Sequence, residues 1–264
     1  MGDGYSSPRI SSEYPDCSLP ITFDVYNICS FRCQYCFAYY QKVSNPSCKG
    51  KNLAVKSVNV KKLIQAFQGK FPNDWKWKYF FKNKFPFHVG GLADNFDNYE
   101  KKLMRGYPLI KVLAKMHYPT IFSTKGVLPM FGKYYKLFKK YRKNKSFAFQ
   151  FSIITNSDKS ASEIEIGCPS TTERLQAMKK MSDLGYWTIL RLRPYIIGLT
   201  DINIDQLIKR AANAGAKAVS AEFFCLEQRI AGEAIEKRYN AISNNIGFNI
   251  REYYKKLSPS ERGT

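Results

Sequence analysis

The chain has 264 residues, with 42 Lys and Arg against 21 Asp and Glu, and a formal net charge of +21 at pH 7. Its composition is that of a folded protein, long enough for one large α/β domain or two small ones. The sequence has no apolar run long enough to predict a membrane helix, and no segment that resembles a signal peptide. We therefore expect a cytoplasmic protein with no membrane partner, and the positive charge favours a polyanionic partner.

Three cysteines near the N-terminus dominate the sequence. Residues 1–20, rich in Ser and Pro, predict an extended lead-in, and the apolar alternation after them predicts a strand at residues 21–26. This strand runs into a loop that carries Cys29, Cys33 and Cys36. Three thiols on one short loop predict a metal site, and such a loop fits a reducing compartment.

Two kinds of metal site fit this loop. Zinc needs a fourth ligand, and the nearest candidates are Cys17 and Cys48. The uneven spacing of three and then two residues favours three corners of a four-iron cluster, with one iron left open for another ligand.

The spacing CxxxCxxC, with the aromatic Tyr35 before the last cysteine, resembles the signature of the radical S-adenosylmethionine (SAM) superfamily. The resemblance implies that Cys29, Cys33 and Cys36 hold a 4Fe-4S cluster whose open iron is chelated by SAM. It also implies an enzyme in which the reduced cluster cleaves SAM to a 5′-deoxyadenosyl radical that takes hydrogen from a substrate. An electron donor such as flavodoxin or ferredoxin is then required.

A basic, aromatic insertion is predicted at residues 39–84. Between residues 37 and 84, eleven lysines stand against one acid. The run at residues 75–82 alternates aromatics with cations, which is typical of a surface that stacks on bases and contacts phosphates. The same pattern also fits solvated helix faces over aromatic core positions.

The second predicted strand, residues 85–89, ends in Gly90 and Gly91, with Asp94 shortly after. Paired glycines at a strand end let a ligand approach the backbone closely. The segment Gly-Gly-Leu-Ala-Asp-Asn-Phe resembles the branch of the superfamily that contains spore photoproduct lyase. The resemblance implies that this backbone binds the amino group of SAM.

Two later strands end in further candidate cofactor contacts. The strand at residues 120–123 runs into Thr-Lys-Gly, and the resemblance implies that Lys125 pairs with the SAM carboxylate. The strand at residues 147–154 carries Ser152, where the resemblance places polar contacts to the cofactor.

The fifth strand, residues 187–193, carries Arg191 and Arg193 on one face. In a parallel barrel that face points inward or toward the helices, and a buried arginine there requires an anionic partner. The segment that follows resembles the region of the superfamily near the adenine, so both arginines are candidate cofactor contacts.

Strands and helices alternate along the chain. A sixth strand is predicted at residues 218–224, and helices are predicted at residues 58–67, 99–116, 131–141, 170–184 and 205–214. The alternation predicts parallel βαβ units with the chemistry at the carboxyl ends of the strands. We expect an α/β fold, a partial (β/α)6 open barrel over residues 21–225, which the resemblance also implies. A helical and polar extension follows at residues 226–264.

One departure concerns the hydrogen donor. Spore photoproduct lyase uses a further cysteine in the segment after the cluster loop, but this sequence has no cysteine from 49 through 167. Cys168 and Cys225 remain as donors, and Cys225, just past the sixth strand, is better placed; both also fit structural thiols. The leading hypothesis is a radical SAM enzyme acting on a nucleobase or nucleotide in or from nucleic acid. The alternatives are a radical SAM enzyme modifying a peptide or protein, and a zinc-containing nucleic-acid-binding protein without enzymatic activity.

Overall fold

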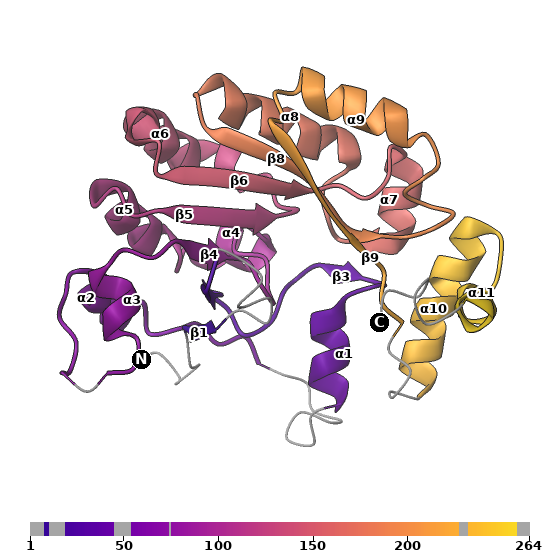
Figure 1. The fold of residues 1–264 in the computed structure, drawn as a ribbon, viewed down its shortest axis with the longest axis horizontal. Helices are drawn as coiled ribbons and strands as arrows, with labels where there is room; N and C mark the ends of the chain where they lie inside the picture. Colours follow the sequence, from indigo (N-terminus) through magenta and orange to yellow (C-terminus); the bar gives the residue numbers. More distant parts are fainter. Residues whose placement is uncertain (1–7, 11–18, 45–53, 74, 227–231, 258–264) are drawn as a thin grey trace.

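A twisted, mostly parallel sheet forms the centre of the protein (Figure 1). The computed structural model describes residues 8–10, 19–44, 54–73, 75–226 and 232–257. In this part of the chain the sheet has seven strands, in the spatial order β1 (Arg9–Ile10), β2 (Ile21–Phe23), β4 (Phe87–Val89), β5 (Thr120–Thr124), β6 (Phe147–Ser152), β8 (Trp187–Tyr195) and β9 (Ala218–Phe223). The six strands from β2 to β9 pair in parallel, and β1 joins β2 antiparallel at one edge. The predicted α/β fold, an open barrel of six parallel strands, is confirmed.

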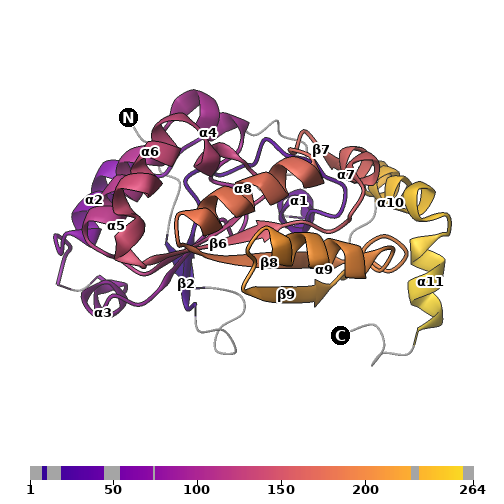
Figure 2. The ribbon, with the colours of Figure 1, turned by 90° about the horizontal axis from the view of Figure 1, so that it is seen from above.

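Helices cover the outer face of the sheet (Figure 2). They are α2 (Val60–Phe67), α3 (Lys78–Lys82), α4 (Asn98–Leu103), α5 (Tyr107–Lys115), α6 (Gly132–Tyr141), α8 (Thr171–Asp183) and α9 (Ile204–Asn213), with the 3-10 turns η1 (Leu128–Met130) and η2 (Arg142–Asn144). Helix α8 starts where the sequence predicts, because Ser170 and Glu173 form a capping box. None of the described helices carries an apolar stretch of membrane-spanning length.

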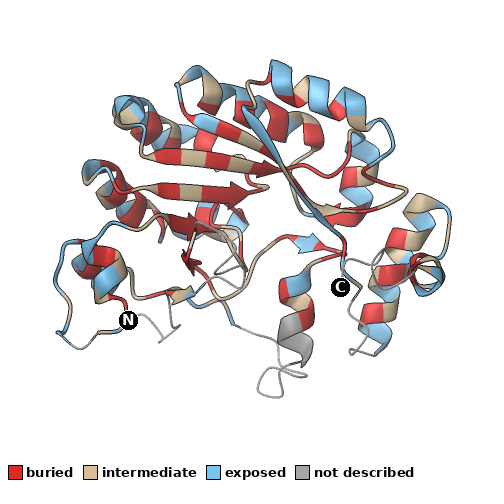
Figure 3. Ribbon diagram, viewed as in Figure 1, coloured by how far each residue is buried: buried red, intermediate tan, exposed pale blue. Residues whose placement is uncertain are grey.

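Aromatic rings fill the layer between the sheet and the helices, where Figure 3 shows buried positions alternating along the strands. Phe122 of β5 and Phe149 of β6 stack at 5.2 Å, and Phe138 of α6 meets Phe149 edge-on at 5.0 Å. Each is fully buried, which contributes about 1.5–3 kcal/mol per ring. Since strand side chains alternate, Ser123 and Gln150 face the other side of the sheet, where the Ser123 hydroxyl donates to the Gln150 Oε1 at 2.7 Å.

Part of the aromatic run at residues 75–82 belongs to the core, so its buried rings do not form the predicted base-stacking surface. Trp77 and Phe81 are buried, and Phe81 packs against Phe67 of α2 at 4.7 Å. Lys76, between two tryptophans, is exposed. These two rings pack inward and Lys76 faces water, as the alternative prediction has it, whereas Tyr79 is 64% exposed.

The helix predicted at residues 99–116 is two helices. Helix α4 ends at Leu103, and Met104 adopts a left-handed conformation with φ of 53°. Helix α5 then begins with Pro108 in its first turn. A proline there has no N–H to donate to the preceding turn, so it starts a helix well but interrupts a continuous one.

A second group of elements surrounds the cysteine loop. These elements are β3 (Arg32–Cys33), α1 (Phe37–Ser44), α7 (Asp158–Ile164), β7 (Glu165–Ile166), α10 (Glu233–Ile246) and α11 (Ile250–Lys256). Tyr239 of α10 packs against Tyr40 of α1 at 5.7 Å, and the Tyr254 hydroxyl of α11 donates to the carbonyl of Phe224 at 2.7 Å. The C-terminal helices therefore share a second hydrophobic core with the cysteine loop.

Candidate functional site

The cysteine loop is anchored on a short segment that the sequence did not predict. Cys33 of β3 lies opposite Glu165 of β7 in a two-stranded antiparallel pair. The Gln34 N–H extends this pair by donating to the carbonyl of Ile164 at 2.9 Å. A segment about 130 residues away in sequence therefore fixes the middle of the loop.

Two further contacts hold the loop from either side. The Ser30 N–H donates to the Asp97 carboxylate at 2.6 Å, and Arg238 of α10 donates to the carbonyl of Cys33 at 2.7 Å. Asp97 also accepts the first N–H groups of α4, as an N-cap does. Burial raises the pKa of Asp97 to about 6, against the hydrogen bond from Ser30, which lowers it.

One cavity of about 690 Å³ lies at the carboxyl ends of the parallel strands. Its volume is within the range of sites for small molecules and cofactors. It is lined by twelve of the thirteen residues predicted as metal ligands, cofactor contacts or hydrogen donors: Cys29, Cys33, Tyr35, Cys36, Gly90, Gly91, Asp94, Lys125, Ser152, Arg191, Arg193 and Cys225. Cys168, the other candidate donor, is not among the lining residues. The fold thus brings separately predicted motifs into one volume.

The three loop thiols line this cavity without converging on a single point. Among the described residues, no three Cys, His, Asp or Glu side chains form a group that holds one metal ion. A zinc ion requires all its ligands within about 2.0–2.3 Å, whereas a four-iron cluster takes thiolates on separate irons. Three thiols lining a common volume fit a cluster. The two candidates for a fourth zinc ligand, Cys17 and Cys48, lie outside the described residues.

The thiols of the loop differ in how readily they ionise. The hydrogen bond between the sulfur atoms of Cys33 and Cys168, 3.7 Å apart, lowers the pKa of Cys33, with Lys125 acting in the same direction and burial opposing it. Burial raises the pKa of Cys29 and of Cys36. Cys33 is therefore the most readily ionised of the three thiols of the loop.

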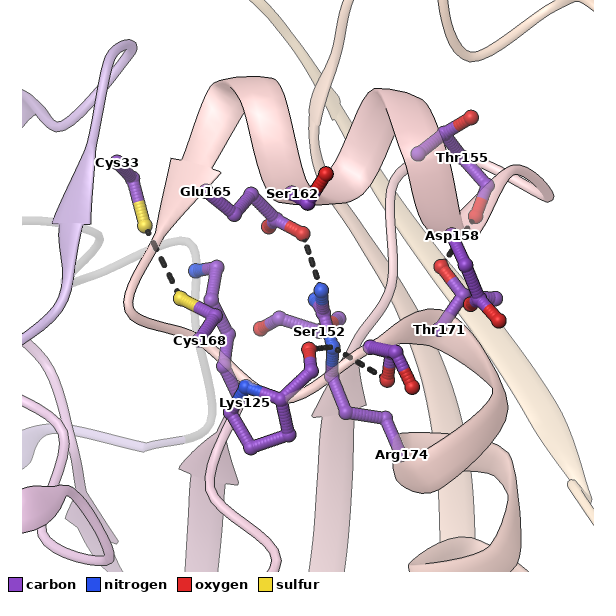
Figure 4. Close-up of polar contacts among 12 residues, drawn as sticks. Cys33, Lys125, Ser152, Thr155, Asp158, Ser162, Glu165, Cys168, Thr171 and Arg174 are labelled. Carbon is purple, nitrogen blue, oxygen red and sulfur yellow. Dashed lines mark hydrogen bonds and ion pairs between the residues drawn. The ribbon is translucent and has the colours of Figure 1, made fainter.

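A buried ionic group lies directly behind the loop (Figure 4). The Glu165 carboxylate pairs with Arg174 and accepts the Tyr35 hydroxyl, and the side chains of the ion pair are at most 1% exposed. Burial alone would raise the pKa of Glu165, but Arg174 and Lys125 outweigh it and lower the pKa. Arg174 also donates to the carbonyl of Ser152 at 2.8 Å, which ties the end of β6 to the same group.

Lys125 lies on the cavity side of this ionic group. Its Nζ lies 5.4 Å from the centre of the Tyr35 ring. Burial acts to lower the pKa of Lys125, but the negative charges of Cys33, Glu165 and Cys168 outweigh burial and raise it above its ordinary value. The side chain is therefore a cation held at the cavity wall.

The strand-end glycines are required by the packing of the sheet. Gly90 has φ of +101°, and a Cβ there would lie 2.2 Å from the carbonyl oxygen of Ser123. A Cβ at Gly91 would lie 2.6 Å from the Thr22 hydroxyl. Asp24, fully buried in the segment after β2, accepts the next two backbone N–H groups at 3.0–3.2 Å and so fixes the glycine loop.

Asp94 joins two strand ends. Its carboxylate accepts the Thr124 hydroxyl at 2.7 Å and the Lys125 N–H at 2.6 Å. Both carboxylate oxygens are therefore used by the protein, and Asp94 shapes the cavity by holding the loops after β4 and β5 together.

The arginines of β8 line the cavity and do not face the helices. Arg193 forms an ion pair with Glu222 of the neighbouring strand β9, which is the anionic partner that the sequence required for an arginine in this position. Cys225, just beyond β9, is exposed and lines the same cavity.

Sequence reasoning missed the acids that hold the site together, Asp24, Asp97 and Glu165. For Asp24 there was a signal, since it is an acid within an otherwise apolar predicted strand. Asp97 and Glu165 bind residues of the cysteine loop that lie 67 and 130 positions away in sequence. No local pattern indicates such a contact.

No protein-family model matches the sequence, and no curated protein matches it. Several solved structures, however, match the fold of this chain. A doubly substituted spore photoproduct lyase with bound SAM and dinucleoside spore photoproduct aligns with a TM-score of 0.63 at 18% identity, over 88% of this chain and 64% of that chain. The lyase complexed with dinucleoside spore photoproduct gives a TM-score of 0.59 at 19% identity over the same shares. Streptococcus suis SuiB bound to precursor peptide SuiA gives 0.52 at 12% identity, over 88% of this chain and 48% of that one.

The chain spans 64% of the length of the lyase that it matches. The resemblance seen in the cysteine and glycine motifs is confirmed at the level of the fold. The chain has the fold of spore photoproduct lyase, an open partial barrel of parallel strands.

Proposed function

We propose that the protein is a radical SAM enzyme. Its cluster ligands are Cys29, Cys33 and Cys36. The observation that carries the proposal is that the cysteine loop and the candidate cofactor contacts, which come from separate strand ends, line one cavity. The residues that would contact SAM are Tyr35, Gly90, Gly91, Lys125, Ser152, Arg191 and Arg193, with Asp94 holding the loops that carry some of them.

When bound, the reduced cluster and SAM supply a 5′-deoxyadenosyl radical that abstracts hydrogen from the substrate. The chain's own residues prepare the site. Lys125 holds a positive charge at the cavity wall, where it would pair with the SAM carboxylate. Glu165 fixes the positions of the cysteine loop and of this lysine relative to each other. Cys225 lies where its thiol can return a hydrogen atom to a product radical. A one-electron donor such as flavodoxin or ferredoxin completes the system.

We propose a nucleobase or nucleotide, in or from nucleic acid, as the substrate. Support comes from the two arginines at the cavity, the net charge of +21, and the dinucleoside bound in the structures of the lyase fold. SuiB, a more distant structural neighbour, is bound to a precursor peptide. A peptide substrate is therefore the second candidate.

Reconstitution tests the enzyme proposal. Protein loaded anaerobically with iron and sulfide, then reduced with dithionite in the presence of SAM, should yield 5′-deoxyadenosine by chromatography. Cys33→Ala should yield none, because one iron loses its ligand. A wild-type protein that stays colourless, retains zinc and releases no deoxyadenosine would refute the proposal and favour a zinc-containing binding protein.

Cys17→Ala and Cys48→Ala serve as matched controls for that experiment. A cluster on the loop of Cys29, Cys33 and Cys36 needs neither residue, so both variants should form deoxyadenosine as the wild type does. If either substitution abolishes metal binding, a four-thiolate zinc site is the better description.

Salt dependence tests the substrate class. Binding to DNA should weaken steeply as salt rises, because phosphate contacts release counterions, and DNA oligonucleotides should increase the yield of deoxyadenosine. Short peptides should do neither. Salt-insensitive or absent DNA binding, with peptides increasing the yield, would reverse the order of the two candidates.

A further inference from the structure

Two cysteines from distant parts of the chain meet beside the cavity. The sulfur atoms of Cys33 and Cys168 lie 3.7 Å apart across 135 residues of sequence (Figure 4). Both are free thiols. Sulfur atoms at this distance are already in contact, and a disulfide requires them to approach to about 2.05 Å. Among the described cysteines, the structure gives no other pair of sulfur atoms in contact.

The backbone around both cysteines is fixed. Cys33 lies in the antiparallel pair of β3 with β7, opposite Glu165. The Cys168 N–H donates to the carbonyl of Glu165 at 3.0 Å and closes a four-residue turn, in which Gly167 has a φ of +80°. The buried ion pair between Glu165 and Arg174 holds β7 against the barrel. The two thiols therefore stay adjacent because the local fold keeps them there.

We propose that Cys33 and Cys168 form a redox modification site, in which a small-molecule disulfide oxidises the two thiols to a Cys33–Cys168 disulfide. Cys33 lines the cavity, where a small reagent can reach it. Its thiolate attacks one sulfur of the reagent, forming a mixed disulfide and releasing one reagent thiol. Cys168 then attacks the Cys33 sulfur and releases the second. The two protein thiols lose two electrons and two protons, which convert the reagent disulfide into two thiols.

The bridge removes a ligand from the cysteine loop. A sulfur held in a disulfide is not a thiolate and does not bind iron, so the oxidised protein cannot load a cluster until the bridge is reduced. This consequence rests on the proposed function, whereas formation of the bridge does not.

Peptide mapping tests the bridge on the ligand-free protein. The reduced protein is treated with one equivalent of 4,4′-dithiodipyridine, capped with iodoacetamide and digested with trypsin without reduction. We expect the peptide of residues 33–42 joined to that of residues 160–174. The first peptide also contains Cys36, so Cys36→Ser should keep the joined species and Cys33→Ser should lose it. A bridge from Cys33 to Cys36 or Cys29, with Cys168 capped, would overturn the proposal.

Cluster loading tests the consequence. Oxidised wild type should take up no cluster, as followed by visible absorbance, until it is reduced, whereas reduced wild type should load fully. Cys168→Ser cannot form the bridge, so the same treatment should release one thiopyridone for each Cys33 from this variant and two from the wild type. Oxidised wild type that carries the mapped bridge and still loads would overturn the gating role. Reduced wild type that loads no cluster would instead refute the proposed function. Whether the Cys33–Cys168 bridge forms is decided by the peptide map alone.

Discussion

Glu165 is the residue on which the cysteine loop, Arg174 and Lys125 depend together. Glu165→Gln keeps the size of the side chain but removes its charge, so Arg174, which is 0% exposed, loses its partner. Breaking a buried ion pair on one side costs about 3–5 kcal/mol. We expect a loss of that order in the free energy of unfolding, measured with urea. Glu163→Gln, two residues earlier and exposed, is the matched control, because glutamine can still accept the hydrogen bond from Asn245; it should change stability by less than about 0.5 kcal/mol.

Asp97 gives the protein a defined pH dependence. Its pKa is about 6 in the folded state against an ordinary value of 3.8, because it is buried. The folded state therefore holds the proton more tightly, so this group adds stability below pH 3.8 that is lost as the pH rises through 6. The full change is about 3 kcal/mol. The cost of Asp97→Asn should be larger at pH 4 than at pH 7 by about that amount in urea unfolding. An equal cost at both pH values would contradict the assignment.

At this scale the sequence predicted the residues that line the cavity better than the residues that hold it. Cys33 and Gly90 belong to short motifs whose spacing is visible in the chain. Asp97 and Glu165 act through contacts across the fold, with partners 67 and 130 residues away. Asp94 was predicted as a cofactor contact, but its carboxylate is occupied by the backbone and hydroxyl of the neighbouring strand end.

Strand β4 depends on its terminal glycine for close packing against β5. Gly90→Ala brings a Cβ to 2.2 Å from the backbone of Ser123 at a φ of +101°. Gly69→Ala imposes a similar backbone strain, at a φ of +81°, with no atom within 4 Å. The control should lose about 1–2 kcal/mol of stability and Gly90→Ala about 2–5 kcal/mol, as measured by urea unfolding. Equal losses would show that the close contact does not matter.

The alternation of strands and helices was predictable because each parallel strand is a short apolar run between turn signals. Pro108 signalled that residues 99–116 form two helices. The prediction of one helix gave more weight to the regular apolar spacing than to this proline. The segment of α7 and β7 had no such signal. Its strand is two residues long and exists because it pairs with the cysteine loop. In the basic aromatic run, lysines between buried rings look the same in sequence as lysines of a binding surface, so the sequence alone does not separate the two.

Part of the positive charge of the molecule lies on the outer helices, away from the cavity. Four lysines of α6 are exposed, Lys133, Lys136, Lys139 and Lys140, on a helix whose Phe138 packs against the outer face of the sheet. No residue of α6 lines the cavity. Replacing all four with Gln should therefore change the affinity for a dinucleotide by less than about twofold, while reducing the salt dependence of binding to a long duplex.

Arg191→Gln is the counterpart on the cavity side. Because the proposed function places Arg191 at SAM, this variant should weaken SAM binding by about 10- to 100-fold, as expected for a lost charged hydrogen bond. Titration of both variants with SAM and with the same dinucleotide separates the two faces. Equal weakening by the α6 variant would mean that the outer helices take part in substrate binding.

The contact from Arg238 to the carbonyl of Cys33 spans 205 residues of sequence. A ribosome adds roughly 5–20 residues each second, so Cys33 emerges about 10–40 s before its partner has been made. Throughout that interval the nascent cysteine loop lacks α10, and for about the first two thirds of it the loop also lacks β7. For the proposed cluster this means that iron reaches a finished site only after the synthesis of a helix that contributes none of the proposed ligands.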